Sequence, residues 1–322
     1  MNTENIVFAV KHKDEEIRAL SRSGGVFTAL SDFVLDNGGV VYGCALNEKF
    51  LAEHRRAAKK EERDAFRGSK YIQSEINNCY NLCAEDLKSG LRVLFSGTPC
   101  QIDALNNFLF LKNVNTANLI TVDILCHGVP SPMVWKDYLN EQFADMKIES
   151  VDFRDKKTFG WRDHAETITV NGEKKHGKCF THLFYSHYIL RPACFNCHYK
   201  KENRVSDITI GDYWKIENND ISFDDDKGIS FVKLNTRKGE SYFKSVEKEL
   251  EIREFPIATS IQPAIDHNYV APSNREDFWR EYGLIPLKEL TEKYTAIPKL
   301  SFIQRAKGVC LKIIKRIIRI IL

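Results

Sequence analysis

Apolar runs alternate with amphipathic stretches through the first 150 residues of the chain. The short apolar runs, each typical of a buried strand, lie at 5–10, 40–46, 91–97 and 119–125. Residues 24–39, between the first two runs, carry apolar side chains at helical spacing. Helices should also follow the later two strands, where Thr98 precedes Pro99 and Ser131 precedes Pro132 as N-cap and first helical residue. This order of elements predicts an α/β fold with a mixed, partly parallel sheet and flanking helices.

After residue 150 the pattern changes to short strands. We expect them at 150–155, 165–170, 207–214 and 229–235, followed by a helix in 245–255 that runs into an edge element. Two short helical stretches, a break at Pro298 and an amphipathic C-terminal helix complete the chain. We therefore divide it into an N-terminal α/β region (1–95), a strand-rich region (96–285) and C-terminal helices (286–322).

Composition and charge narrow the class of protein. The chain has 322 residues, of which 43% are hydrophobic and 28% charged, which is typical of a globular protein. Residues 1–300 hold 41 Lys and Arg against 44 Asp and Glu, so nucleic acid is not an expected partner. The first ten residues lack the pattern of a secretory signal. We expect a cytoplasmic protein, in which clustered cysteines among the nine indicate metal binding or catalysis rather than disulfides.

The last 22 residues differ from the rest, because they hold six Lys and Arg and no acid. Lys312, Lys315, Arg316 and Arg319 recur every three or four positions between isoleucines, which predicts a basic amphipathic helix. Such a helix suits the surface of an anionic bilayer, so residues 304–322 are a candidate peripheral membrane contact at the inner face of the membrane. Docking on the protein's own body or on a partner explains the same pattern.

Four cysteines form the main candidate site. Cys194 and Cys197 are spaced C-x-x-C, while Cys100 and Cys126 each follow a predicted strand. Because the carboxyl ends of parallel strands share one edge of a sheet, the latter two should be neighbours. Four thiols suffice for a [4Fe-4S] cluster or a structural zinc. Thiol catalysis, with Cys100 as nucleophile and His127 as base in a hydrolase or transferase, is a further interpretation of the same residues.

Several ordered segments together resemble one protein family. They read SRSGGVFTAL, RGSKYIQS, FSGTPCQI, DILCHGVPSPMVW, FRDKKTFGW, CFNCHYK, RVSDITIGDYW and NREDFW, and they span roughly residues 20 to 285. The chain resembles the beta subunit of coenzyme F-420 hydrogenases and dehydrogenases. The resemblance implies FAD, one [4Fe-4S] cluster, and electron transfer between a hydride carrier or substrate and iron–sulfur centres.

The resemblance also implies the site residues. The cluster ligands would be Cys100, Cys126, Cys194 and Cys197. Flavin contacts would come from two segments, and they map to Ser23, Gly24, Gly25, Thr28, Ser69, Lys70, Tyr71, Gln73 and Ser74. A helix N-terminus with a nearby lysine suits a pyrophosphate, so Lys70 is expected on the phosphate side of the flavin.

One departure from the larger relatives limits the expected cofactors. Many of them carry an additional C-x-x-C-x-x-C-x-x-x-C segment, which this chain lacks, so we expect a single cluster. Electrons must then arrive or leave through a partner, which is an electron donor or acceptor protein or a soluble hydride carrier. The carrier is coenzyme F-420 or another donor. Short bacterial members of this type are often linked with polysaccharide biosynthesis. The remaining alternative is a zinc-stabilised accessory module in surface-polysaccharide assembly.

Overall fold

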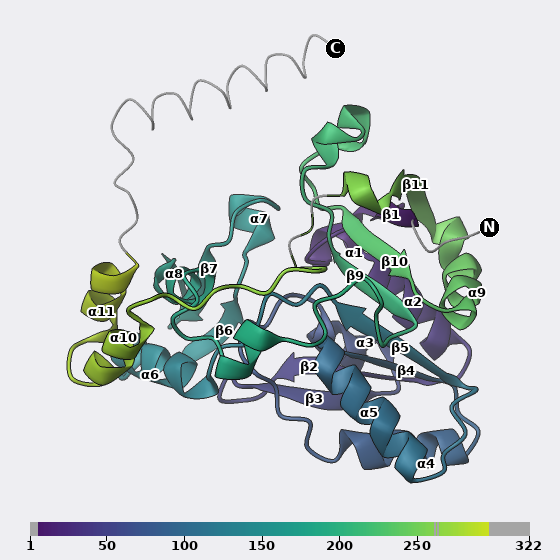
Figure 1. The fold of residues 1–322 in the computed structure, drawn as a ribbon, viewed down its shortest axis with the longest axis horizontal. Coiled ribbons are helices and arrows are strands. Elements are labelled where there is room, and N and C mark those ends of the chain that lie inside the picture. The colour runs from purple at the N-terminus through teal and green to yellow at the C-terminus, as the bar shows by residue number, and fades with distance from the viewer. Residues whose placement is uncertain (1–5, 261, 263, 296–322) are drawn as a thin grey trace. The chain divides into compact units, whose positions relative to one another are not determined.

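A computed structural model describes residues 6–260, 262 and 264–295. The chain forms two compact units, residues 1–272 and residues 273–322. The first unit contains an eight-stranded sheet in the order β11-β1-β10-β9-β5-β4-β2-β3 (Figure 1). Its strands are β1 Ile6–His12, β2 Val40–Leu46, β3 Ala52–Ala57, β4 Val93–Gly97, β5 Leu119–Ile124, β9 Ile208–Asp212, β10 Ser230–Leu234 and β11 Leu250–Pro256. The predicted partly parallel sheet is confirmed.

The pairing of the strands defines one functional edge. Strands β2, β4, β5 and β9 are mutually parallel, while β10 is antiparallel to both β9 and β1. It follows that β1 runs in the same direction as these four strands. Five strands therefore end on one side of the sheet, which we call the carboxyl edge, and ligands of open α/β sheets bind at such an edge.

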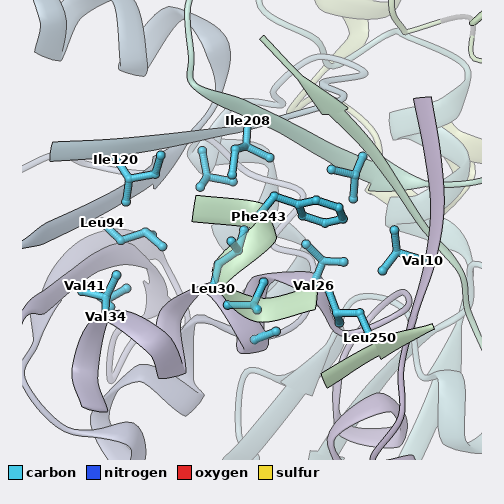
Figure 2. Packing of buried hydrophobic residues seen from close by; sticks show 14 of the residues in the cluster. Val10, Val26, Leu30, Val34, Val41, Leu94, Ile120, Ile208, Phe243 and Leu250 are labelled. Atoms are coloured by element: carbon cyan, nitrogen blue, oxygen red, sulfur yellow. The ribbon is translucent and has the colours of Figure 1, made fainter. Parts of the chain in front are cut away.

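Helices cover both faces of this sheet. Alternate strand residues such as Val41 and Leu94 pack with Leu30 of α2 (Val26–Asp36) and Phe243 of α9 (Arg237–Val246), as Figure 2 shows. The residues between them on the strands face the opposite way, toward α4 (Cys79–Lys88) and α5 (Pro99–Leu111). This period of two places apolar side chains on both faces, as expected for a sheet buried between helices.

A second, three-stranded sheet lies in the same unit. It consists of β6 Ile148–Asp152, β7 Glu166–Val170 and β8 Glu173–Gly177, with α6 Pro132–Phe143, α7 Lys156–Phe159 and α8 Cys179–Tyr185 nearby in the sequence. Its core is aromatic, since the ring of Trp135 lies 4.5 Å from that of Phe153 and 4.8 Å from that of Phe180. The shorter elements are α1 Glu15–Leu20, α3 Lys60–Arg63 and the 3₁₀ helices Asp64–Phe66, Pro192–Asn196, Ile216–Asn218, Ile221–Phe223, Glu247–Glu249 and Ile257–Thr259.

The strand expected at 207–214 is present as β9, which lies in the middle of the large sheet beside β5. The helix expected in 245–255 needs correction, because α9 ends at Val246. The edge element expected after the helix is present as the edge strand β11. The second unit contains α10 Arg275–Glu281 and α11 Leu287–Tyr294. α11 falls in the C-terminal region where short helices were expected, whereas α10 begins before it, within the NREDFW segment. The basic tail lies outside the described residues. Within the described residues, no helix is long and apolar enough to cross a membrane.

Candidate cofactor site at the carboxyl edge

Three segments carry the four candidate cysteines to the carboxyl edge. Cys100 is the second residue of α5, directly after β4, and Thr98 caps that helix as expected. Cys126 follows β5 by two residues, and the 3₁₀ helix Pro192–Asn196 holds Cys194, with Cys197 just beyond it. The loop after β5 is fastened to the third segment, because the N–H of Arg191 donates to the carbonyl of Val129 at 3.0 Å.

The charges of these thiols act on one another. The pKa of Cys126 is raised to about 12, mainly by burial and in smaller part by the thiolate charges of Cys100 and Cys194. Burial likewise raises the pKa of Cys194, with further contributions from Cys197 and Cys100. Because such effects weaken with distance, Cys100, Cys126 and Cys194 lie near one another, with Cys197 near Cys194.

The surroundings of the thiols fit a cluster of four thiolates. Backbone hydrogen bonds from Gly128 and Val129 favour the charged forms of Cys126 and Cys194, respectively. The Lys200 ammonium also lies near the thiols. In the described part of the chain, no three His, Cys, Asp or Glu side chains are arranged to hold a single metal ion. A four-iron cluster binds one thiolate at each iron and therefore accepts a wider set than one zinc ion does.

A buried arginine holds the cysteine loop against β5. Arg204 pairs with Asp123 at 3.1 Å, and their side chains are 2% and 0% exposed. It also donates to the carbonyls of Ile124 and Tyr199, at 3.1 and 2.9 Å. The hydroxyl of Tyr199 in turn donates to Asp103 of α5 at 2.8 Å. These contacts connect all three cysteine-bearing segments.

The first predicted flavin segment forms a tightly packed turn before α2. Gly25 is the N-cap of α2 with φ +95°, in the left-handed region that favours glycine. A Cβ on Gly24 would lie 2.0 Å from the carbonyl oxygen of Val10, so only glycine fits there. Ser23 is half-buried and donates to the carbonyl of Ile229, whereas Thr28 is fully buried. Of these residues, Ser23 is the one most open to a ligand.

The second predicted flavin segment begins beside the first. Arg67 Nε donates to Thr28 Oγ1 at 3.2 Å, which joins the two segments. The ammonium of Lys70 donates to the carbonyls of Arg67, Ala65 and Gly68 at 2.7, 2.9 and 3.3 Å. Burial lowers the pKa of Lys70 to about 8. A phosphate at Lys70 must therefore replace at least one of these carbonyls.

The same segment continues toward the cysteines. After the half-buried Ser69 and Lys70, the ring of Tyr71 stacks on Phe184 with 4.7 Å between centroids. The backbone N–H of Gln73 donates to the carbonyl of Pro130, in the loop that follows Cys126. The segment therefore crosses the carboxyl edge from the α2 side to the cysteine side.

A histidine that the sequence did not single out completes this link. Nε2 of His54 in β3 donates to the carbonyl of Ser96 at 3.0 Å, so the ring proton is on Nε2. Nδ1 is therefore free to accept a hydrogen bond, and it accepts one from the hydroxyl of Ser74 at 3.1 Å. Ser74 Oγ accepts from Gln101 Nε2 at 2.9 Å, and Gln101 forms the capping box of α5 with Thr98. Ser74 is thus connected to the helix turn that presents Cys100.

The proposed nucleophile and base of a thiol enzyme do not pair. Cys100 Sγ bonds to Thr98 Oγ1 at 3.1 Å, and His127 Nε2 bonds to His187 Nε2 at 2.9 Å. The hydrogen bonds of both side chains therefore go elsewhere, which disfavours the thiol hydrolase or transferase.

A buried ion pair at the end of β9 lies next to the flavin segment. Arg154 binds Asp212 at 2.6 Å and donates to the hydroxyl of Tyr71 at 3.3 Å. Asp212 also accepts from Trp161 Nε1 at 2.7 Å. Arg154 and Asp212 both lie in segments that carry the family resemblance, but the sequence did not indicate that they pair, because the pair forms only in the folded protein.

Fold and site together define a mixed α/β protein that gathers thiols and polar side chains at the carboxyl edge of its sheet. Residues 90–259 match the family described as the C terminus of the coenzyme F420 hydrogenase/dehydrogenase beta subunit. The chain belongs to this family, as the sequence resemblance indicated.

Two individual proteins extend the comparison. The chain is 24% identical over 256 residues to the F subunit of the F(420)H(2) dehydrogenase of Methanosarcina mazei, covering 77% of this chain and 65% of that protein. It also resembles a chain of the F420-reducing [NiFe] hydrogenase complex of Methanosarcina barkeri, with a TM-score of 0.53 and 20% identity over 90% of this chain and 88% of that one. The chain thus spans just under two thirds of the length of the dehydrogenase subunit. At 20% identity, the comparison with the hydrogenase chain shows a similar fold.

Proposed function

We propose that this protein is an iron–sulfur flavoprotein oxidoreductase. It transfers electrons between a hydride carrier and a substrate or electron-transfer partner through FAD and one [4Fe-4S] cluster. FAD supplies the step between two-electron and one-electron chemistry, because a flavin accepts a hydride and releases electrons singly. Cys100, Cys126, Cys194 and Cys197 would hold the cluster, and the segments 23–28 and 69–74 would hold the flavin.

The convergence of the four thiols beside the 69–74 segment carries this proposal. The thiols come from three separate segments, yet Cys126 is within reach of the charges of Cys100 and Cys194, and Cys194 is within reach of those of Cys197 and Cys100. Gln101, next to Cys100, bonds directly to Ser74 of the predicted flavin segment. A flavin held along residues 69–74 would therefore lie close to the cluster, as electron transfer between them requires.

Anaerobic purification of the full chain tests the proposal. The same sample is assayed for iron, acid-labile sulfide, zinc and released flavin, and its absorbance spectrum is recorded. We expect about four irons and one FAD per chain. Zinc in place of iron, or no flavin after reconstitution with FAD, would reject the proposal and favour an accessory module.

The identity of the hydride carrier is a separate part of the proposal. The names of the relatives support coenzyme F-420 as one candidate, and a nicotinamide is the other. Anaerobic mixing with reduced coenzyme F-420 or with NADH distinguishes them, since the true donor bleaches the flavin absorbance. A role in polysaccharide biosynthesis stays a prediction, to be tested by the surface polysaccharide of a strain that lacks the gene.

A further inference from the structure

Two large apolar side chains lie exposed next to each other at the end of α5. Phe110 is 80% exposed and Leu111 is 81% exposed, and in the described part of the chain no other two consecutive large apolar residues are exposed. The remaining exposed apolar side chains, such as Ile221, occur singly, as is normal on protein surfaces. We call Phe110 and Leu111 the α5 tip. An exposed apolar pair of this kind is typical of a contact surface, because its burial is favourable.

The fold holds the α5 tip at the edge of the sheet opposite to the candidate cofactor site. Helix α5 begins at the carboxyl edge after β4 and ends before β5 begins, so its last residues lie at the opposite edge, which we call the amino edge. Leu105 and Leu109 of the same helix are fully buried in the core under α4 and α5. Because this packing fixes the rotation of α5 about its axis, the tip faces outward and cannot fold back onto the protein.

The surroundings of the α5 tip are cationic. Residues 104–118 and residues 87–93 contain no acidic residue. The two segments lie side by side, because the side-chain amide of Asn118 donates to the carbonyl of Gly90 at 3.1 Å. Their charged residues are Lys88, Arg92 and Lys112. The amino edge therefore combines apolar and positive side chains here, although residues 1–300 as a whole carry more acidic than basic residues.

The size and charge of this surface favour a lipid membrane over a protein partner. Two side chains of this size offer about 300 Å² of apolar area, whereas a stable protein interface needs about 800 Å² on each partner. A bilayer requires no matching surface, since each apolar side chain that enters the acyl boundary contributes separately. Cations beside the inserted side chains are attracted by anionic headgroups.

We propose that the α5 tip inserts into the interface of an anionic bilayer, while Lys88, Arg92 and Lys112 contact the headgroups. This contact is separate from residues 304–322, whose sequence predicts a basic amphipathic helix. Stable attachment to a membrane takes two signals, so loss of either one should release the protein. With the amino edge on the membrane, the carboxyl edge stays accessible to soluble partners.

The test uses the full-length, anaerobically purified protein and vesicles of phosphatidylcholine, with or without an equal share of phosphatidylglycerol. Binding is measured by sedimentation. The variant Phe110→Asn with Leu111→Asn removes the α5 tip, and its fold should be preserved because both side chains are exposed. Ile221→Asn is the matched control, since Ile221 is 77% exposed and lies in the segment that follows β9 at the carboxyl edge. Iron content and the unfolding midpoint of each variant monitor folding.

The wild type and Ile221→Asn should bind the anionic vesicles equally. The double asparagine variant should bind at least about tenfold more weakly, because two apolar side chains no longer enter the bilayer. Lys88→Gln and Lys112→Gln should each weaken binding to the anionic vesicles about fivefold, the effect of one lost charge at the membrane surface.

Fluorescence gives a direct readout of insertion. The emission that Phe110→Trp adds to that of the wild type should be quenched by brominated lipids, because position 110 enters the acyl boundary. The emission that Ile221→Trp adds should not be quenched. Equal quenching at both positions would overturn the inference.

Equal binding by the wild type and by Phe110→Asn with Leu111→Asn would also overturn the inference, because residues 304–322 would then account for the binding alone. A wild type that binds neither kind of vesicle, or an equal loss in Ile221→Asn, would overturn it as well. Self-association without vesicles that disappears in the double variant would instead assign the α5 tip to a second copy of the chain. These outcomes concern lipid binding only, so the proposed function is tested separately by the iron and flavin content.

Discussion

Replacing Arg204 by methionine should destabilise the protein strongly, because it leaves a buried carboxylate without its partner. The Arg204 side chain is 2% exposed and that of Asp123 is 0% exposed, with 3.1 Å between them. Removing one partner of a buried ion pair costs about 3–5 kcal/mol. Methionine retains much of the volume, so the loss reflects the stranded charge and the two carbonyls rather than a large cavity.

A double-mutant cycle isolates this effect. Asp123→Asn removes the charge while keeping the shape of the side chain. The double variant Asp123→Asn with Arg204→Met should therefore recover about 2 kcal/mol relative to Arg204→Met alone. Free energies of unfolding are measured by urea denaturation under anaerobic conditions, with and without iron reconstitution. A single variant within about 1 kcal/mol of wild type, or a double variant no better than the single one, would refute the reasoning.

The pH dependence of the single variant provides a second check. Burial raises the pKa of Asp123 and the charge of Arg204 opposes this rise. Without Arg204, the folded-state pKa lies still further above the unfolded value. Stability from such a raised pKa is present at low pH and is lost as pH rises through the folded-state pKa. The deficit of Arg204→Met relative to wild type should therefore become smaller as the pH is lowered toward the pKa of Asp123.

Four further outcomes follow from the site. Cys197→Ala should abolish the visible absorbance of the cluster, and a variant with full iron content would remove Cys197 from the ligands. Lys70→Ala should lower flavin occupancy without loss of iron. The pKa of Lys70 is about 8, so Lys70 loses its charge between pH 7 and pH 9, and the FAD affinity of the wild type should fall over this range. The affinity of Lys70→Arg should not fall, because arginine stays charged. If FAD affinity depends on pH in the same way in both proteins, a contact between Lys70 and a phosphate is contradicted. Gln101→Leu should weaken FAD binding about fivefold, because Ser74 loses its hydrogen bond to Gln101. Unchanged FAD binding would mean that this hydrogen bond stabilises the fold but does not position the flavin segment. Residues 304–322 lie outside the described residues, and their deletion should release the protein from anionic liposomes. If the full-length chain does not bind such liposomes, the membrane interpretation is wrong and docking on the protein's own body or on a partner is favoured.

The sequence predicted the strand ends because their signals are local. Apolar runs followed by Thr98 and Pro99, or by Ser131 and Pro132, specify a strand, a turn and a helix start within a few residues. The neighbourhood of Cys100 and Cys126 then follows from the parallel pairing of β4 with β5.

Helix α9 was misplaced because its sequence contains a glycine that its packing requires. Gly239 lies inside the helix, where glycine lowers helix propensity. A Cβ at this position would lie 2.3 Å from the carbonyl oxygen of Asp207, so the close approach of α9 to the chain before β9 excludes other residues. The tertiary contact that explains this glycine has no trace in the local pattern.

His54, Arg204 and Asp212 were missed for a related reason, since each acquires its role from a partner more than 20 residues away.

The common location of these residues at the carboxyl edge nevertheless has a physical meaning. A cluster bound by three loops and a flavin along two segments would each cost ordering entropy if those segments were free. The hydrogen bonds that Ser74 donates to His54 and that Arg204 donates to the cysteine loop already fix these segments. Much of the ordering cost of the two proposed cofactors would therefore be met during folding, and a carboxyl edge built from loops could then hold both in a defined relation.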